Sequence, residues 1–299
     1  MRVGYIGLGN MGAPIAARLL REYEVAVYDR NDAAVTRLAQ HGATACRSAA
    51  QVGAGCDVVL LCLPTSDHVR SVLFDDGGIA DVAKPGTVII DQTTGDPAVI
   101  RAMAVQLDAC GLALVDAPVS GGPAAAEKGT LAIMVGATDV QFDHVAPVLR
   151  TISTRIFHAG GIGAGHMIKL VNNLLSAVQT VASLEVLALV ANNSVDPGRA
   201  VEIILANSGR NFYLETFVAS HILTGNLNSG FTLEVLHKDA KLACRIGVES
   251  GVPMLLGSLA RDIYQIAINE LGSDADGNAI ALVIDRLACS HLVPSDQPT

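Results

Sequence analysis

The sequence has no tryptophan and little charge: of its 299 residues, 4% are aromatic and 16% are charged. Hydrophobic residues make up 51%, so small aliphatic side chains must build the core that a chain of this length can bury. This composition excludes an intrinsically disordered chain, a coiled coil and a collagen-like fibre. It indicates a globular protein with one large domain or two domains, at roughly 150 residues per domain.

Positive charge is also scarce. The 20 lysines and arginines are outnumbered by 29 aspartates and glutamates, which gives a formal net charge of −9. A surface this negative repels nucleic acids and anionic lipid headgroups, so neither is expected as a partner. An anionic ligand must therefore be bound at a local positive site.

The cysteines and histidines form no pattern of paired ligands. The six cysteines include no Cys-x-x-Cys pair, and the eight histidines include no pair four residues apart. We therefore expect reduced thiols in a cytoplasmic protein and no catalytic metal. Polar residues interrupt the most apolar stretch, 174–190, and glycines at 7, 9 and 12 interrupt the apolar N-terminus. Neither a membrane span nor a secretion signal is predicted.

Short β-branched runs alternate with amphipathic stretches through the first half of the chain. The predicted strands are 3–6, 25–28, 58–63, 87–90, 112–116, 131–135 and 155–158, with helices predicted among them at 13–20, 33–41 and 97–110. This alternation predicts a doubly wound α/β domain, in which helices cover both faces of a parallel sheet.

After residue 158 the pattern changes. A glycine-rich connector at 159–165 leads into helical spacing over 167–190, and further helices are predicted at 197–208, 212–223, 233–250, 253–270 and 275–289. We therefore predict an α/β domain over residues 1–160 and an all-α domain over residues 161–299. The apolar character of the second half predicts buried subunit contacts, and hence a homodimer or homotetramer.

A glycine-rich turn, Gly7-Leu8-Gly9-Asn10-Met11-Gly12, joins the first predicted strand to the first predicted helix. In this context Gly7 permits a tight turn, Gly9 lets the backbone approach a pyrophosphate, and Gly12 lets the helix pack closely on the strand. The phosphates would lie at the N-terminal amides of the helix, where the helix dipole is positive. The turn therefore predicts a Rossmann domain that binds NAD or NADP through these six residues.

The end of the second predicted strand bears on the choice between the two cofactors. Asp29 lies twenty residues after Gly9, where a carboxylate accepts hydrogen bonds from the ribose hydroxyls and repels a 2′-phosphate. Arg30 either stacks on the adenine, pairs with the 2′-phosphate of NADP, or is an ordinary surface charge. NAD is therefore the predicted cofactor, and NADP stays open.

Two later strands end in segments that are positioned to line the cofactor site. Leu63 and Pro64 follow one strand and Thr94 follows the next. Ligands of doubly wound sheets bind outside the carboxyl ends of the strands. We predict that Leu63 and Pro64 lie on the adenosine side and that Thr94 lies nearer the nicotinamide.

The strand that ends at Asp116 is followed by Ala117-Pro118-Val119-Ser120-Gly121-Gly122-Pro123. The prolines stiffen this segment, while the glycines leave backbone N–H groups free to point at a ligand beside the Ser120 hydroxyl. The segment therefore predicts a binding site for a carboxylate. The alternative is a plain turn.

The long helix predicted over 167–190 carries Lys169, Asn172, Asn173 and Ser176, whose spacing puts them on one face. Solvated faces favour glutamate and lysine over paired asparagines, so this stripe is expected to face a polar cleft. Lys169 would serve there as a general acid or base, and Asn173 would hold the substrate oxygen. The alternative for Lys169 is a surface cation.

Taken together, these segments resemble the β-hydroxyacid dehydrogenase family, which includes 3-hydroxyisobutyrate dehydrogenases and tartronate semialdehyde reductases. Four blocks carry the resemblance: residues 7–12, residues 116–122, residues 163–173 and the pair Lys238-Asp239. They occur in the family's order. The family fold, a Rossmann domain followed by an all-α domain, agrees with the pattern above.

The resemblance implies roles for individual residues. Lys169 matches the family's catalytic lysine and Asn173 its substrate-binding asparagine. Lys238 matches a lysine that reaches the cofactor side of the cleft, with Asp239 supporting it. The remaining matches are the carboxylate-binding Ser120, Gly121 and Gly122 and the dinucleotide-contacting Leu63, Pro64 and Thr94.

The sequence departs from the family pattern at two places. Gln92-Thr93 stands where relatives often have Ser-Ser, which bears on substrate preference. His68 stands where a common relative has asparagine, so no cofactor contact is assigned to it.

The predicted reaction is hydride transfer between the nicotinamide and a small β-hydroxyacid or its semialdehyde, as in 3-hydroxyisobutyrate dehydrogenase. The alternative within the family is a tartronate semialdehyde (2-hydroxy-3-oxopropionate) reductase or another short-chain semialdehyde reductase. Imine reduction is disfavoured because relatives that catalyse it generally replace the lysine. A non-catalytic dinucleotide-binding protein is the alternative from another class, but it would not need Lys169, Asn173 and the carboxylate-binding segment together.

Overall fold

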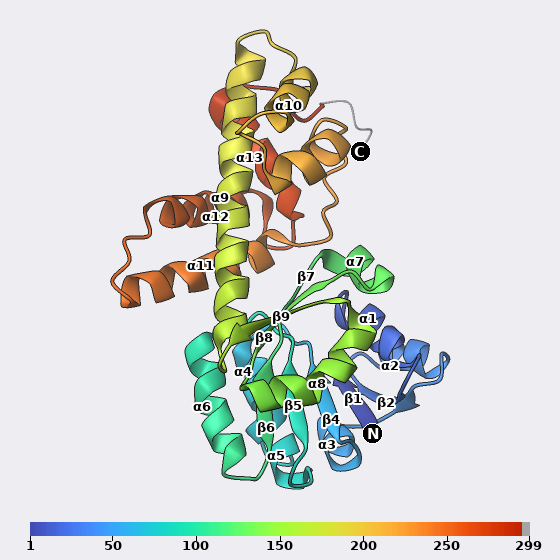
Figure 1. Ribbon diagram of the computed structural model, residues 1–299. Coiled ribbons are helices and arrows are strands. Elements are labelled where there is room, and N and C mark those ends of the chain that lie inside the picture. The colour runs from blue at the N-terminus through green and yellow to red at the C-terminus, as the bar shows by residue number, and fades with distance from the viewer. Residues whose placement is uncertain (295–299) are drawn as a thin grey trace. The chain divides into compact units, whose positions relative to one another are not determined.

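The computed structural model describes residues 1–294 and divides into two compact units, Met1–Lys169 and the chain from Leu170 onward (Figure 1). A single helix, α9 (Ala164–Asn192), begins in the first unit and continues into the second. The domain boundary predicted after residue 160 stays a prediction.

The first unit is built on one sheet. Among residues 1–294 its strands are β1 (Arg2–Ile6), β2 (Glu24–Tyr28), β3 (Thr44–Ala45), β4 (Val58–Leu61), β5 (Val88–Asp91), β6 (Ala113–Asp116), β7 (Val119–Ser120), β8 (Ala132–Gly136) and β9 (Arg155–Gly160). Their order is β3-β2-β1-β4-β5-β6-β8-β7, with β9 also paired to β8. Strands β1 to β6 are parallel, as predicted.

The predicted doubly wound α/β fold is confirmed, and the strands after β6 add antiparallel pairs to its parallel sheet. Strand β8 runs antiparallel to both β6 and β7. Both β6 and β7 pair with β8 in the same register, in which Asp116 faces Gly136 and Ser120 faces Ala132. Pro118 lies between these two strands and has no N–H to donate to the ladder, although its carbonyl accepts a hydrogen bond from the Met134 N–H at 3.1 Å.

Helices cover both faces of this sheet. They are α1 (Gly12–Leu19), α2 (Asp32–Ala39), α3 (Ala49–Gly55), α4 (Ser66–Phe74), α5 (Ile79–Val82), α6 (Pro97–Asp108), α7 (Gly122–Lys128) and α8 (Asp139–Ile152). Several begin at a side chain that accepts a backbone N–H, including Asn31, Ser48, Thr65, Asp96 and Thr138. Such caps satisfy amides that have no partner inside the helix.

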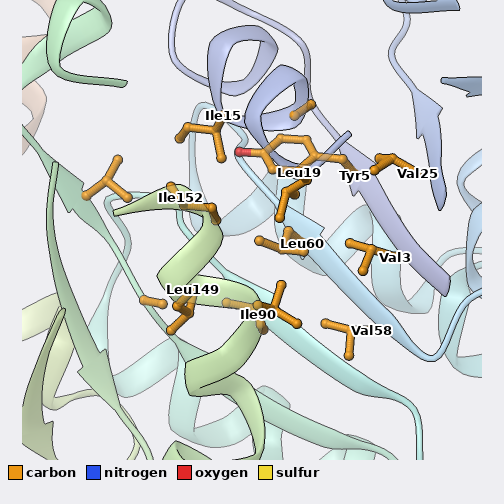
Figure 2. Packing of buried hydrophobic residues seen from close by; sticks show 14 of the residues in the cluster. Val3, Tyr5, Ile15, Leu19, Val25, Val58, Leu60, Ile90, Leu149 and Ile152 are labelled. Atoms are coloured by element: carbon orange, nitrogen blue, oxygen red, sulfur yellow. The ribbon is translucent and has the colours of Figure 1, made fainter. Parts of the chain in front are cut away.

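Alternation along the strands gives the unit two apolar layers. Val3 and Tyr5 of β1 pack with Ile15 and Leu19 of α1 and with Leu149 of α8 (Figure 2). The next residues along the strands point to the opposite face, where they pack against α3 to α6. Because both faces are buried, each strand is apolar along its length, which made the central strands predictable.

The second unit is helical, as predicted. Its elements are the rest of α9, α10 (Pro197–Leu205), the π-helix η1 (Leu214–Ile222), α11 (Leu233–Glu249), α12 (Leu255–Leu271), the 3-10 turn η2 (Gly277–Ala279) and α13 (Ile280–Ala288). Leu184 and Leu187 of α9 lie in a core with Val218, Tyr264 and Ile280. The predicted helix over 212–223 forms with π-helical hydrogen bonding.

Helix α9 has 29 residues, which corresponds to a length of about 44 Å. It extends beyond the predicted range of 167–190 at both ends. By length and composition alone it is apolar enough to cross a membrane, and 44% of its most apolar stretch is buried within the protein.

Candidate active site

The glycine turn lies at the carboxyl end of β1, at the point where the strand order reverses between β1 and β4. Gly7 has φ +96°, and its N–H donates to the Tyr28 carbonyl at 3.1 Å. A Cβ atom on Gly7 would lie 2.2 Å from the Cys62 carbonyl oxygen, and one on Gly12 would lie 1.8 Å from the Gly7 carbonyl oxygen. The fold itself therefore requires glycine at both positions.

Gly9 differs from these two glycines. It is exposed, and a Cβ atom built on it would meet nothing within 4 Å. The packing of the chain therefore does not explain a glycine there, whereas the close approach of a pyrophosphate does. The turn fits a dinucleotide on this observation. Of its other residues, Leu8 is buried, Met11 is half-buried and Asn10 is exposed.

Asp29 is fixed at the carboxyl end of β2 by two backbone amides. The Leu8 N–H donates to Oδ2 at 2.5 Å, and the Asn31 N–H donates to Oδ1 at 2.7 Å. Each carboxylate oxygen keeps a lone pair for a further donor, so the group is oriented to accept hydrogen bonds from hydroxyls. Arg30, the next residue, is exposed.

The segments after β4 and β5 are tied to each other and to the glycine turn. The Leu63 N–H donates to the Thr93 hydroxyl at 3.1 Å, and the Leu63 side chain reaches within 3.0 Å of the place that a Gly7 Cβ would occupy. Pro64 is exposed and Thr94 is half-buried. Leu63, Pro64 and Thr94 thus lie at the same edge of the sheet as the glycine turn.

The predicted carboxylate-binding segment lies where β7 passes into α7. Ser120 is half-buried and is the last residue of β7. Gly121 has φ +134° and Gly122 has φ +74°, both in the left-handed region that side chains disfavour. Gly121 immediately precedes α7 and Gly122 is its first residue, so the segment is a strand-to-helix turn.

Lys169 belongs to the start of α9 and is 9% exposed. The alternative reading of this residue as a surface cation is therefore wrong. On the same helix Asn172 is exposed, while Asn173 and Ser176 are half-buried.

In the second unit, a buried carboxylate connects two predicted residues. Asp239, which is 2% exposed, accepts a hydrogen bond from Asn173 Nδ2 at 2.7 Å. Its other oxygen lies 2.9 Å from Lys238 Nζ. Asn172 Nδ2 donates to Asn173 Oδ1 at 3.2 Å, which completes the orientation of the Asn173 amide. Asp239 thus contacts Asn173 as well as Lys238, the residue that the resemblance implied it would support.

Three buried residues in the first unit had no predicted role of their own: Asp91, Asp116 and His166, all 0% exposed. Asp91 and Asp116 are register partners at the ends of β5 and β6. Asp116 Oδ1 accepts the Gly163 N–H at 2.6 Å, and Oδ2 accepts the His166 N–H at 2.7 Å. His166 Nε2 lies 3.7 Å from Asp91 Oδ2.

Burial dominates the titration of the two carboxyls. Desolvation raises the pKa of Asp91 to about 7, although hydrogen bonds from Thr93 lower it. Desolvation likewise raises the pKa of Asp116 to about 6, against backbone hydrogen bonds from Gly163 and His166. Charged residues that end neighbouring strands of a buried sheet are the signal that would have pointed to this cluster.

Two family models together cover most of the chain. The NAD binding domain of 6-phosphogluconate dehydrogenase matches residues 2–163. The NAD-binding domain of NADP-dependent 3-hydroxyisobutyrate dehydrogenase matches residues 163–284.

Curated relatives match along nearly the full length. The 2-(hydroxymethyl)glutarate dehydrogenase of Eubacterium barkeri is 38% identical over 266 residues, which cover 89% of this chain and 88% of the relative. The NAD-dependent L-serine dehydrogenase of Pseudomonas aeruginosa is 34% identical over 291 residues, which cover 95% and 98%.

A solved structure has the same fold. The 3-hydroxyisobutyrate dehydrogenase of Mycobacterium tuberculosis, described with L-serine, matches with a TM-score of 0.85 and 30% identity over 95% of this chain and 99% of that one.

Proposed function

The chain belongs to the β-hydroxyacid dehydrogenase family and is an NAD(P)-dependent oxidoreductase, and from this premise we propose that it interconverts a short β-hydroxyacid and its semialdehyde, as 3-hydroxyisobutyrate dehydrogenase does. The observation that carries the proposal is the buried Lys169 near the start of α9, with Asn173 four residues later on the same face of the helix. The named relatives act on 2-(hydroxymethyl)glutarate and L-serine, which are small hydroxyacids.

In the proposed mechanism, the Lys169 amine takes the proton of the substrate hydroxyl during oxidation and returns a proton to the carbonyl oxygen during reduction. When bound, the nicotinamide supplies the hydride acceptor or donor for the carbon. Asn173 orients the substrate oxygen, because Asp239 and Asn172 hold its amide in one orientation. Ser120 and the amides of Gly121 and Gly122 bind the substrate carboxylate and so position the reacting carbon.

The cofactor site proposed here comprises the turn at residues 7–12 together with Asp29, Arg30, Leu63, Pro64, Thr94 and Lys238. The open space at Gly9 supports it. We propose NAD as the preferred cofactor, because the oriented Asp29 carboxylate would repel a 2′-phosphate. The ratio of kcat/KM for NAD to that for NADP tests this preference. A higher kcat/KM with NADP would mean that pairing of Arg30 with the 2′-phosphate outweighs repulsion by Asp29.

The substrate side chain separates the members of the family. The proposed substrate is a C3 to C5 hydroxyacid of the 3-hydroxyisobutyrate type. Tartronate semialdehyde and other short-chain semialdehydes are the second candidate, since the same lysine and carboxylate-binding segment would serve them. A panel of C3 to C5 hydroxyacids and semialdehydes, each tested with NAD(H) and NADP(H), decides between the two. Absence of turnover with all of them would contradict the proposal.

We also propose that the protein is a cytoplasmic homodimer or homotetramer. Large apolar side chains are exposed together from the end of α11 into α12: Val248, Val252, Leu255, Leu256 and Leu259. Exposed apolar patches of this kind mark interfaces. Light scattering after size-exclusion chromatography gives the mass of the wild type and of a Leu256→Glu, Leu259→Glu variant. A wild-type mass equal to one chain would contradict the proposal.

A further inference from the structure

The first turn of α9 obtains its hydrogen-bond acceptor from the sheet. Helix N-termini usually begin at a residue whose side chain accepts an N–H of the first turn. The residue before α9 is Gly163, which has no side chain. Asp116, 47 residues earlier at the end of β6, accepts the Gly163 N–H at 2.6 Å and the His166 N–H at 2.7 Å. A buried charged acceptor therefore fixes the start of this helix.

Glycines make this contact very close. A Cβ atom on Gly165 would lie 2.2 Å from the Met134 carbonyl oxygen and 2.9 Å from Asp116 Oδ2. A Cβ atom on Gly136 would lie 2.2 Å from Asp116 Oδ1. Backbone and carboxylate thus meet without room for a single methyl group, so the first turn of α9 has little freedom to move along the sheet edge.

The His166 side chain provides a second contact, through close packing. Its Cε1 atom lies 2.9 Å from the place that a Gly95 Cβ would occupy, and its Nε2 atom lies 3.7 Å from Asp91 Oδ2. The backbone of this residue is bound to Asp116 and its ring lies at the end of β5. The backbone hydrogen bond and the close packing of the ring, on neighbouring strands, together restrict rotation of the first turn.

Lys169 follows His166 by three residues, a rise of about 4.5 Å. Residues three apart in a helix are neighbours on its surface. A shift or rotation of the first turn therefore also displaces the Lys169 side chain. A displacement of about 1 Å in a reacting group costs on the order of 100-fold in rate.

We propose that Asp116 is a positioning residue for Lys169: by binding the first-turn amides of α9, its carboxylate sets the location of the amine that exchanges the substrate proton. This inference rests on the proposed role of Lys169. The proposed role of Asp116 involves no contact with substrate or cofactor. Asp116 acts through the backbone of the helix.

The test compares two substitutions of buried, amide-binding carboxylates. Asp116→Asn keeps the size of the side chain but removes its charge and one acceptor. Asp285→Asn is the matched control, because Asp285 is 9% exposed and accepts the Leu292 N–H at 2.8 Å in the second unit. We expect Asp116→Asn to lower kcat at least 10-fold with the cofactor KM within about 3-fold of wild type, and Asp285→Asn to leave kcat within about 2-fold. An unchanged kcat in Asp116→Asn, or an equal fall in both variants, overturns the proposal.

A second measurement does not depend on turnover. Lysines of the folded protein are labelled with a small amine-reactive reagent, and the rate for the Lys169 peptide is divided by that for exposed Lys128. We expect this ratio to rise several-fold in Asp116→Asn and to stay at the wild-type value in Asp285→Asn. An unchanged ratio in Asp116→Asn overturns the positioning role. If wild type oxidises no hydroxyacid, the proposed function fails while this ratio still decides the inference.

A third variant applies if Asp116→Asn does not fold. Gly165→Ala keeps the carboxylate and favours the helical conformation, but its methyl group displaces the first turn from the Met134 carbonyl. We expect the same fall in kcat and the same rise in Lys169 labelling. Wild-type values for both would contradict the proposal.

Discussion

The two units of the chain hold the groups of the candidate site by different means. In the first unit the contacts run through the backbone: the Leu8 amide binds Asp29, and the Gly163 amide binds Asp116. In the second unit they run between side chains, from Asn173 and Lys238 to Asp239. The first arrangement tolerates few added atoms, because glycine carbons approach carbonyl oxygens closely. The second arrangement consists of contacts between side chains, so a single substitution can weaken one contact and leave the backbone in place.

The largest effect is expected at Lys169, the last residue of the first unit. Lys169→Ala should lower kcat by about 10²- to 10⁴-fold, the usual contribution of a general acid or base. Fluorescence titration with NADH should show cofactor affinity within a few-fold of wild type. Lys241→Ala removes an exposed lysine of α11 and serves as the control. Near-normal turnover in Lys169→Ala would contradict the proposal that a residue of α9 is the general acid or base.

The carboxyls at the ends of β5 and β6 should make the stability of the first unit depend on pH. The pKa of Asp91 is about 7 in the folded chain against the ordinary value of 3.8, so the folded state binds the proton more tightly. Between pH 4 and 7 this group therefore favours folding at the lower pH, and its contribution is lost as the pH rises through 7. A pKa difference of about three units corresponds to a change of about 4 kcal/mol in the free energy of unfolding.

Thermal unfolding of wild type and Asp91→Asn between pH 5 and 8 checks this expectation. The melting temperature of wild type should fall more steeply with rising pH than that of the variant. Asp196→Asn changes an exposed carboxylate that caps α10 in the second unit, and its slope should match wild type. Equal slopes in wild type and Asp91→Asn would show that Asp91 is already ionised at pH 5.

The three glycines of the turn after β1 allow binding to be separated from folding. Gly9→Ala should weaken NADH binding about 10-fold or more while leaving the melting temperature unchanged, because its methyl group enters open space that a ligand would occupy. Gly12→Ala should instead lower the melting temperature, since its methyl group would overlap the Gly7 carbonyl. Calorimetry gives the NADH affinity of both variants, and thermal unfolding gives their melting temperatures. A destabilised Gly9→Ala protein would contradict the distinction.

The smallest effect is expected from the side-chain contacts of the second unit. Asp239→Asn weakens the pair with Lys238 and turns an acceptor for Asn173 into an amide. We expect about a 10-fold loss in kcat/KM for the hydroxyacid, in the range of a hydrogen bond to a charged group. Asn226→Ala in an exposed turn is the control. A loss as large as that of Lys169→Ala would show that the second unit contributes more to the reaction than orientation.

The central strands were predictable because each is buried on both faces and reads as an apolar run. β3 and β7 were not, because each has two residues. Helices α3, α5 and α7 are too short to give a strong periodic signal, and α8 contains Pro147 in its interior, which disfavours a continuous helix there. The antiparallel direction of β8 depends on its pairing with β6 and β7, which sequence pattern alone does not locate.

The candidate site was predictable where a residue acts through its local sequence, as in the glycine turn and the spacing of Lys169 and Asn173. It was not predictable where a contact depends on which residues of two paired strands lie opposite each other. Asp91 faces Asp116 only because β5 and β6 pair with these two residues opposite each other. The contact of Asp116 with the amide of His166, 50 residues later, likewise exists only in the folded sheet.

The sheet-borne acceptor for the start of α9 also bears on the order in which the protein folds. The Gly163 and His166 amides gain a partner only after β6 is in place, so they should become protected from hydrogen exchange together with the sheet rather than with the rest of the helix. A fragment that begins at residue 160 lacks Asp116, so the first turn of α9 should be frayed in it. The longest helix of the protein is thus completed at its N-terminal end by a strand synthesised well before it.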